Sequence, residues 1–379
     1  MNERNAPRAR TVPARQARVP RALAIAVGAF LLAWGISLLA APSAFGGSGE
    51  AVSGAGAGEG STIPVEAAGE GSTTPAPAAA GEENPRVVFV AGARSHGYGA
   101  HEHNAGSLLL SRLMVAGVDG VEVDVHHDGW PEDHSFFDGA DAIVIFANGG
   151  PGHPALPHLD FLGDLMDDGV GLVLLHYAVE VPGEDAGEEF LDWVGGYFET
   201  HWSVNPHWVM EAMEMPDHPV ARGVEPYGID DEWYYHMRFR DGMAGVHPII
   251  TALPPASSLE RDDGPHSGNP HVREAVLERE EPQHLAWAAD RPGGGRGFGF
   301  TGAHWHWNWG HPMQRRVVLN AIAWAAGIDV PEGGVPVGHV TMADLVANQD
   351  YDRPENFNAA RWEGLMQEWA REFGHHEHH

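Results

Sequence analysis

The chain of 379 residues has a formal net charge of −31, from 22 basic and 53 acidic residues, and it contains neither cysteine nor lysine. These absences exclude thiol nucleophiles, disulfides, thiolate zinc sites, Schiff-base lysines and P-loop lysines. An acidic chain without a basic stripe repels phosphate backbones, so no nucleic-acid partner is expected. Because the 25 histidines and 13 tryptophans are abundant for this length, we expect any chemistry to depend on His, carboxylates, Tyr, Ser or a bound metal.

The first 85 residues have the composition of an export segment followed by a linker. Residues 1–21 contain six arginines and one acidic residue, and an uncharged apolar run follows at 22–41. Residues 1–41 are therefore predicted to be a signal peptide or an N-terminal membrane anchor. In both cases the rest is exported, and the protein is periplasmic, secreted or membrane-anchored facing outside the cytoplasm. Residues 42–85 are rich in Gly, Ala and Pro and predict a disordered linker.

From residue 86 the sequence alternates between predicted strands and helices. Short apolar runs predict strands at 86–92, 121–125, 141–147, 170–176, 284–289 and 297–303. Helices are predicted from Asn104, over 158–168 and from Met313 to Ala326. This alternation over 86–330 predicts an α/β fold with a mostly parallel central sheet, in which ligands bind beyond the carboxyl ends of the strands.

Residues 331–379 predict a C-terminal helical extension with a His-rich tail. Its apolar residues fall at helical spacing and indicate core packing: Trp362, Leu365, Met366, Trp369 and Phe373.

Histidines gather where the predicted strands end. A Gly-rich loop with His96, His101 and His103 follows the first strand, and His176 and Tyr177 follow the fourth. The strand-to-helix elbow is where α/β hydrolases and amidotransferases hold their nucleophile. A satisfied core histidine is the ordinary alternative, but the position favours a functional role for His176.

The segment TGAHWHWNWGH (301–311) offers the most specific pattern. If 304–309 is extended, side chains alternate between its faces, with His304, His306 and Asn308 on one face and Trp305, Trp307 and Trp309 on the other. A polar row backed by indole rings suits a sugar. The alternative is that the tryptophans belong to the core.

A further segment, DDEWYYHMRFRD (230–241), combines carboxylates with aromatic residues and an imidazole. Glu232 and His236 together are suited to act as a general base and an orienting group. A half-buried strand with a charged rim is the alternative. His201 and His207 lie a little upstream. The His-x-His pairs suit zinc or a similar divalent metal, although no segment has a diagnostic spacing such as H-E-x-x-H.

Four motifs in this order, GVGLVLLHYA, VGGYFETH, DEWYYHMRF and GRGFGFTGAHWHWNWGH, followed by a helix ending in WAAG, resemble the ThuA-like family. That family is named for trehalose utilisation. The resemblance runs from about Arg86 to about Gly327. It implies a flavodoxin-like sandwich of the class I glutamine amidotransferase-like superfamily, with His176 where amidotransferases carry cysteine. The missing cysteine excludes the amidotransferase reaction.

The resemblance also implies a pocket and a role in sugar metabolism, including the processing of keto-disaccharides. The family's recurrent polar positions match His176, His201, Asp231, Glu232 and the His304/His306 stretch. Together these observations predict an exported hydrolase, lyase or isomerase that acts on a glycoside or keto-sugar, its small-molecule partner. The alternatives are a non-catalytic sugar- or metal-binding module tethered to the membrane, and a structural ThuA-like domain.

The candidate site residues fall into three groups. The catalytic candidates are His176, Glu232 and Asp231. The substrate-binding candidates are Tyr177, His201, Trp233, Tyr234, Trp305, Trp307 and Asn308. The metal-ligand candidates are His101, His103, His304 and His306. A shared pocket requires His101, His103, His176 and His304 to converge.

Overall fold

The structure, a computed structural model, describes residues 84–183 and 185–374. The predicted signal peptide or anchor, nearly all of the predicted linker and the His-rich tail lie outside these ranges. Within them, no helix combines the length and the apolar character needed to span a membrane.

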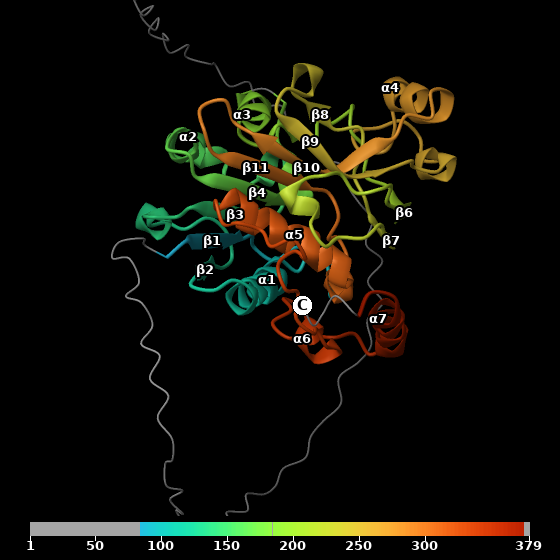
Figure 1. Ribbon diagram of the computed structural model, residues 1–379. Coiled ribbons are helices and arrows are strands. Elements are labelled where there is room, and N and C mark those ends of the chain that lie inside the picture. Colours follow the sequence, from blue (N-terminus) through green and yellow to red (C-terminus); the bar gives the residue numbers. More distant parts are fainter. Residues whose placement is uncertain (1–83, 184, 375–379) are drawn as a thin grey trace, which may run out of the picture. The chain divides into compact units, whose positions relative to one another are not determined.

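The described residues form a seven-stranded central sheet in the order β2-β1-β3-β4-β11-β10-β9 (Figure 1). Its strands are β1 (Arg86–Ala91), β2 (Glu122–His126), β3 (Ala142–Phe146), β4 (Gly171–Leu175), β9 (Val246–Ala252), β10 (Gln283–Asp290) and β11 (Arg296–Phe300). β2, β1, β3, β4 and β11 pair in parallel, whereas β10 is antiparallel to both of its neighbours. The prediction of a mostly parallel sheet is confirmed.

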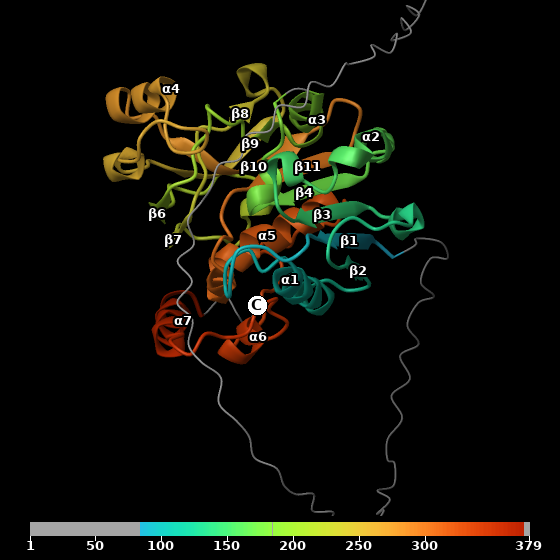
Figure 2. The same cartoon turned by 180° about the vertical axis from the view of Figure 1, so that it is seen from behind.

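Helices cover both faces of this sheet, which makes the fold a flavodoxin-like α/β sandwich (Figures 1 and 2). The longer helices are α1 (His103–Gly117), α2 (Leu159–Asp167), α3 (Asp185–Val194), α5 (Pro312–Ala325) and α7 (Ala359–Phe373). Successive residues of a central strand point to opposite faces. Val144 and Val173 therefore pack in one core with α1 and α5, and Ile143 and Leu174 pack in the other with α2 and α3.

Shorter elements lie beside the sheet. β6 (His207–Glu211) pairs with β7 (Gly228–Glu232), and β5 (Gly196–Tyr197) pairs with β8 (Arg238–Phe239), both antiparallel. The short helices are α4 (Pro270–Arg273) and α6 (Met342–Val346). The 3-10 turns and one π-helical turn are 134–137, 150–152, 156–158, 176–179, 219–221, 241–243, 256–259, 274–278 and 306–310.

The C-terminal extension packs on the body through α7. The rings of Trp369 and Phe373 each lie 5.0 Å from the ring of His311, which caps α5. The apolar stripe predicted for this segment is thus a helical packing face. Helix α7 begins at Ala359 and ends at Phe373.

The prediction of an extended segment at 304–309 is wrong. Residues His306–Gly310 form a 3-10 helix that leads into α5. Backbone hydrogen bonds close this turn, from Asn308 to the Trp305 carbonyl and from His311 to the Asn308 carbonyl, each 3.0 Å. Alternation does not apply in a 3-10 helix. The side chains of His306, Trp307 and Asn308 are buried instead of forming a polar and an indole face.

Candidate functional site

His176 lies at the elbow directly after β4, as predicted. It begins the short turn 176–179 with a φ of +54°, in the left-handed region that residues other than glycine seldom adopt. Gly149, after β3, allows this elbow to pack closely, because a Cβ at that position would lie 2.0 Å from the Tyr177 carbonyl oxygen. Such strained backbone persists where the surrounding structure fixes it, and it clusters at functional sites.

His101 and His304 approach His176 from two other strand ends. His101 lies in the loop between β1 and α1, also with a positive φ of 52°, and its amide donates to the His304 carbonyl at 3.0 Å. His304 follows β11. Because parallel strands end at one edge of a sheet, these three loops meet there.

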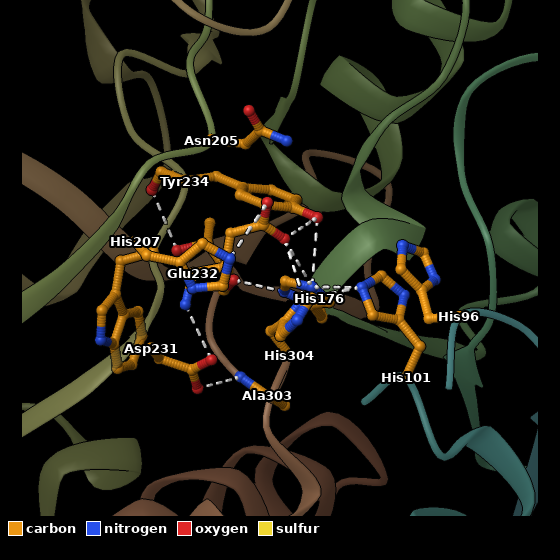
Figure 3. A network of polar contacts seen from close by, with 12 residues as sticks. His96, His101, His176, Asn205, His207, Asp231, Glu232, Tyr234, Ala303 and His304 are labelled. Atoms are coloured by element: carbon orange, nitrogen blue, oxygen red, sulfur yellow. Dashed lines mark hydrogen bonds and ion pairs between the residues drawn. The ribbon is translucent and has the colours of Figure 1, made fainter. Parts of the chain in front are cut away.

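Among the described residues, three imidazoles and one carboxylate converge: His101, His176, His304 and Glu232 (Figure 3). One ligand atom from each lies within 4.8 Å of the others. Nε2 of His101 lies 3.0 Å from Nδ1 of His304 and 3.1 Å from Nε2 of His176. Oε2 of Glu232 lies 3.0 Å from Nδ1 of His304 and 3.5 Å from Nε2 of His176. We call these four residues the His₃Glu group.

Asp231 positions the loop that carries His304. Its carboxylate is fully buried and accepts hydrogen bonds from the backbone amides of Ala303 (2.8 Å), Trp305 (3.2 Å) and Glu232 (2.9 Å). Two successive residues of β7 therefore differ in what they contact. Asp231 binds the backbone of the His304 loop, and Glu232 faces the imidazole rings (Figure 3). This geometry makes Asp231 a positioning residue, in place of the catalytic role predicted from the sequence.

Hydrogen bonding and burial prepare these side chains to bind a cation. The Thr301 carbonyl can only accept, so Nδ1 of His176 carries a proton toward it, at 2.8 Å, and leaves the Nε2 lone pair facing the group. Burial, followed by the neighbouring imidazoles, strongly lowers the pKa of His101, which stays neutral. Burial alone raises the pKa of Glu232, but the contacts of its carboxylate with His176 and His304 outweigh burial and lower the pKa overall.

The donor set fits a divalent metal. A neutral imidazole nitrogen makes one hydrogen bond, yet Nε2 of His101 faces two ring nitrogens at 3.0 and 3.1 Å. A cation at the centre would accept all of these lone pairs together. Tetrahedral zinc with bonds of about 2.0–2.1 Å places ligand atoms about 3.3 Å apart. Four of the six pairs in the group lie at 3.0–3.5 Å, and all four ligand atoms lie within 4.8 Å of one another. The His₃Glu group can therefore hold zinc or a similar ion.

Aromatic and polar side chains surround the group. The Tyr234 hydroxyl lies 3.1 Å from Nε2 of His176 and donates to Glu232 at 3.4 Å. Burial, with the charge of Glu232 next, raises the pKa of Tyr234 well above its ordinary value, so it remains a proton donor. His207 and Trp305 form the more open side, and their rings lie 4.8 and 4.6 Å from that of His304.

Comparison with known proteins places this architecture in a family. A family model described as trehalose utilisation (ThuA) matches residues 86–325. The chain belongs to the ThuA family. Two solved structures of ThuA-like proteins are similar. One, from Bacteroides uniformis ATCC 8492, is 17% identical with a TM-score of 0.46 and covers 70% of this chain and 99% of its own. The other, from Parabacteroides merdae ATCC 43184, is 16% identical with a TM-score of 0.43 and covers 71% and 97%.

No curated protein sequence matches the chain. Membership of this family indicates a carbohydrate-related role.

Several predicted site residues of this ThuA-family chain are not members of the His₃Glu group, although the His103 ring lies 5.8 Å from that of His101. His103 begins α1 and its Nδ1 bonds the Ala93 carbonyl at 3.1 Å. His306 is buried under the backbone of Leu345 in α6, and burial lowers its pKa to about 4. His201 is solvent-exposed beside the loop at 263–271. Of the four histidines predicted as metal ligands, His101 and His304 belong to the His₃Glu group, whereas His103 and His306 do not.

The predicted sugar platform is also smaller than the sequence indicates. Trp233 is fully buried and donates to the Ile229 carbonyl. Trp307 is buried against Tyr98 and Trp362. The Asn308 amide donates to the Asp230 carbonyl at 2.9 Å. These three are packing residues, whereas Trp305 remains partly exposed beside the site.

One pair near the group was not among the predicted site residues. The Glu180 carboxylate is only 2% exposed and pairs through both oxygens with Nε2 of His266, at 2.9 and 3.1 Å. The hydrogen bond to Glu180 raises the pKa of His266. Burial, followed by the charges of Glu180 and Glu232, raises the pKa of Tyr177 to about 12. Glu180 and His266 are 86 residues apart in the sequence, so no local pattern could predict that they pair.

Proposed function

We propose that this ThuA-family protein is a metal-dependent enzyme that acts on a sugar, as a hydrolase, lyase or isomerase of a glycoside or keto-sugar. One observation carries the proposal: His101, His176, His304 and Glu232 direct their ligand atoms to a common point at the carboxyl edge of the sheet. A structural core has no need of three desolvated imidazoles facing one another, because each unpaired polar group costs free energy.

The side chains around the group supply what such a reaction needs. A bound divalent ion polarises a carbonyl or hydroxyl oxygen. The Tyr234 hydroxyl and the Glu180–His266 pair are the acid and base candidates, since His176 and Glu232 are committed to the group. The partly exposed indole of Trp305 offers a flat apolar face to sugar C–H groups, and His207 lies beside it.

The proposal includes export. It rests on the arginine-rich residues 1–21 and the apolar run 22–41, which have the order of a signal peptide or anchor. Fractionation of cells that express the full chain tests it: we expect the protein outside the cytoplasm, and a cytoplasmic location contradicts this part of the proposal.

The activity is tested by turnover on a panel of glycosides and 3-keto-glycosides. We expect turnover by the metal-loaded protein and its loss in His176→Ala. The matched control is His247→Ala, because His247 is a half-exposed histidine of β9 that pairs with Asp290 of β10 and is not part of the His₃Glu group. Sugar binding that persists without turnover on any substrate would instead support a tethered, non-catalytic binding module.

A further inference from the structure

The loop that presents His101 is held in a strained conformation. His96, Gly99 and His101 all have positive φ, at 51°, 79° and 52°. Two of them are not glycines, so this backbone is unfavourable on its own. Contacts from outside the loop must stabilise it.

Glu102, next to the ligand His101, provides the main contact. Its side chain is 1% exposed. One carboxylate oxygen accepts from the Gly99 amide at 2.9 Å, inside the loop. The other accepts from the Asp350 amide at 2.8 Å, in the C-terminal extension. A single buried carboxylate thus joins the ligand loop to a segment 248 residues away.

A second set of contacts joins the same two segments. The Asn104 amide donates to the Asp350 carboxylate at 3.0 Å. The Tyr98 ring lies 5.1 Å from the Phe357 ring, edge on. The Arg94 guanidinium lies 4.9 Å from the ring centre of Tyr351. The extension therefore contacts the loop through hydrogen bonds, aromatic packing and a cation–π contact.

The match to the ThuA family model ends at residue 325, so these contacts come from a segment outside the matched domain. We infer that the C-terminal extension, described over residues 331–374, is a clamp that positions His101 for metal binding, and that Glu102 is the positioning residue that joins the two segments. This inference rests on the proposed metal centre. It adds that, although all four ligand candidates lie within the matched domain, the loop that carries His101 depends on the extension for its position.

The test measures the Zn²⁺ dissociation constant of the full chain and its Glu102→Gln variant. The amide of Gln cannot accept from both backbone N–H groups, because one of its two polar atoms is a donor. We expect the dissociation constant to rise at least tenfold. Tyr98→Leu removes only the aromatic contact with Phe357, and we expect a smaller rise in the Zn²⁺ dissociation constant. This second variant keeps the inference testable if Glu102→Gln does not fold.

The matched control is Asp344→Asn. Asp344 lies in the same extension, where it caps α6 and pairs with Arg112, but it does not contact the loop. We expect it to lower the melting temperature and to change Zn²⁺ affinity less than twofold. Equal loss of affinity in Glu102→Gln and Asp344→Asn, or no loss in Glu102→Gln, would overturn the clamp.

Amide hydrogen exchange separates this inference from the proposed function. If the wild-type chain binds no metal, the proposed centre fails, but the clamp still predicts faster exchange at 95–103 in Glu102→Gln than in Asp344→Asn. We expect at least a tenfold difference in rate. Equal exchange in the two variants would refute the clamp whatever the metal result.

Discussion

Replacing Asp231 by asparagine tests how the His304 loop is held. The Asp231 carboxylate is completely buried and accepts three backbone N–H groups, at 2.8, 2.9 and 3.2 Å. Asparagine keeps one oxygen for Trp305 and Glu232 but turns an NH₂ group toward the Ala303 amide. That change removes one charge-assisted hydrogen bond and leaves a buried donor unpaired, which costs about 2–3 kcal/mol. We expect that loss in the free energy of unfolding, together with weaker metal binding.

Urea unfolding of the wild type and Asp231→Asn measures the loss directly. Asp230→Asn is the matched control, because Asp230 is the preceding residue of β7 and is exposed on its other face. We expect the control to change the free energy of unfolding by less than about 0.5 kcal/mol. Equal effects of the two substitutions, or no measurable loss in Asp231→Asn, would refute the positioning role of Asp231.

Two further predictions concern buried polar side chains that are not members of the His₃Glu group. Asn320 in α5 donates to two backbone carbonyls and accepts from the Val335 amide at 2.7 Å. Asn320→Leu should therefore lower the free energy of unfolding by about 3 kcal/mol. Chemical denaturation measures this change, and a loss below about 1 kcal/mol contradicts the prediction. Burial lowers the pKa of His153 from 6.5 to about 4, so the unfolded chain takes up a proton before the folded chain does as the pH falls from 6.5 toward 4. Stability should therefore decline across that window by up to about 1.4 kcal/mol per pH unit from this residue. His153→Gln should be less stable at pH 7 but should show a shallower decline, and unfolding curves with parallel pH dependence would count against this assignment.

Six of the seven strands were predictable because their signals are local, whereas β9 (Val246–Ala252), which contains Pro248, was not predicted. Buried parallel strands are short continuous apolar runs, such as those ending at Ala91 and Leu175, and they need no knowledge of their neighbours. The position of His176 followed from the same signal, since the elbow lies where the apolar run of β4 ends. The rule that ligands bind at the carboxyl ends of strands then directed attention to the correct edge.

The composition of the centre was harder to predict because it depends on turns. His304 and His306 are two residues apart, and an extended backbone would place both on one face. The 3-10 helix at 306–310 buries His306 away from the group instead. Likewise, α1 begins at His103, so the His103 ring bonds the Ala93 carbonyl whereas the His101 ring joins the His₃Glu group. Glu232 was predicted as an acid–base residue, because the sequence does not show that β7 brings it to the histidines.

Metal analysis of the purified full chain is the most direct test of the proposed metal centre. The chain is loaded with Zn²⁺, freed of excess ion, and compared with His101→Ala, Glu232→Gln and the exposed control His247→Ala by elemental analysis. We expect about one ion per chain in the wild type and the control, and strong depletion in the other two variants. A wild type that retains no ion, or variants that retain as much as the wild type, would contradict it.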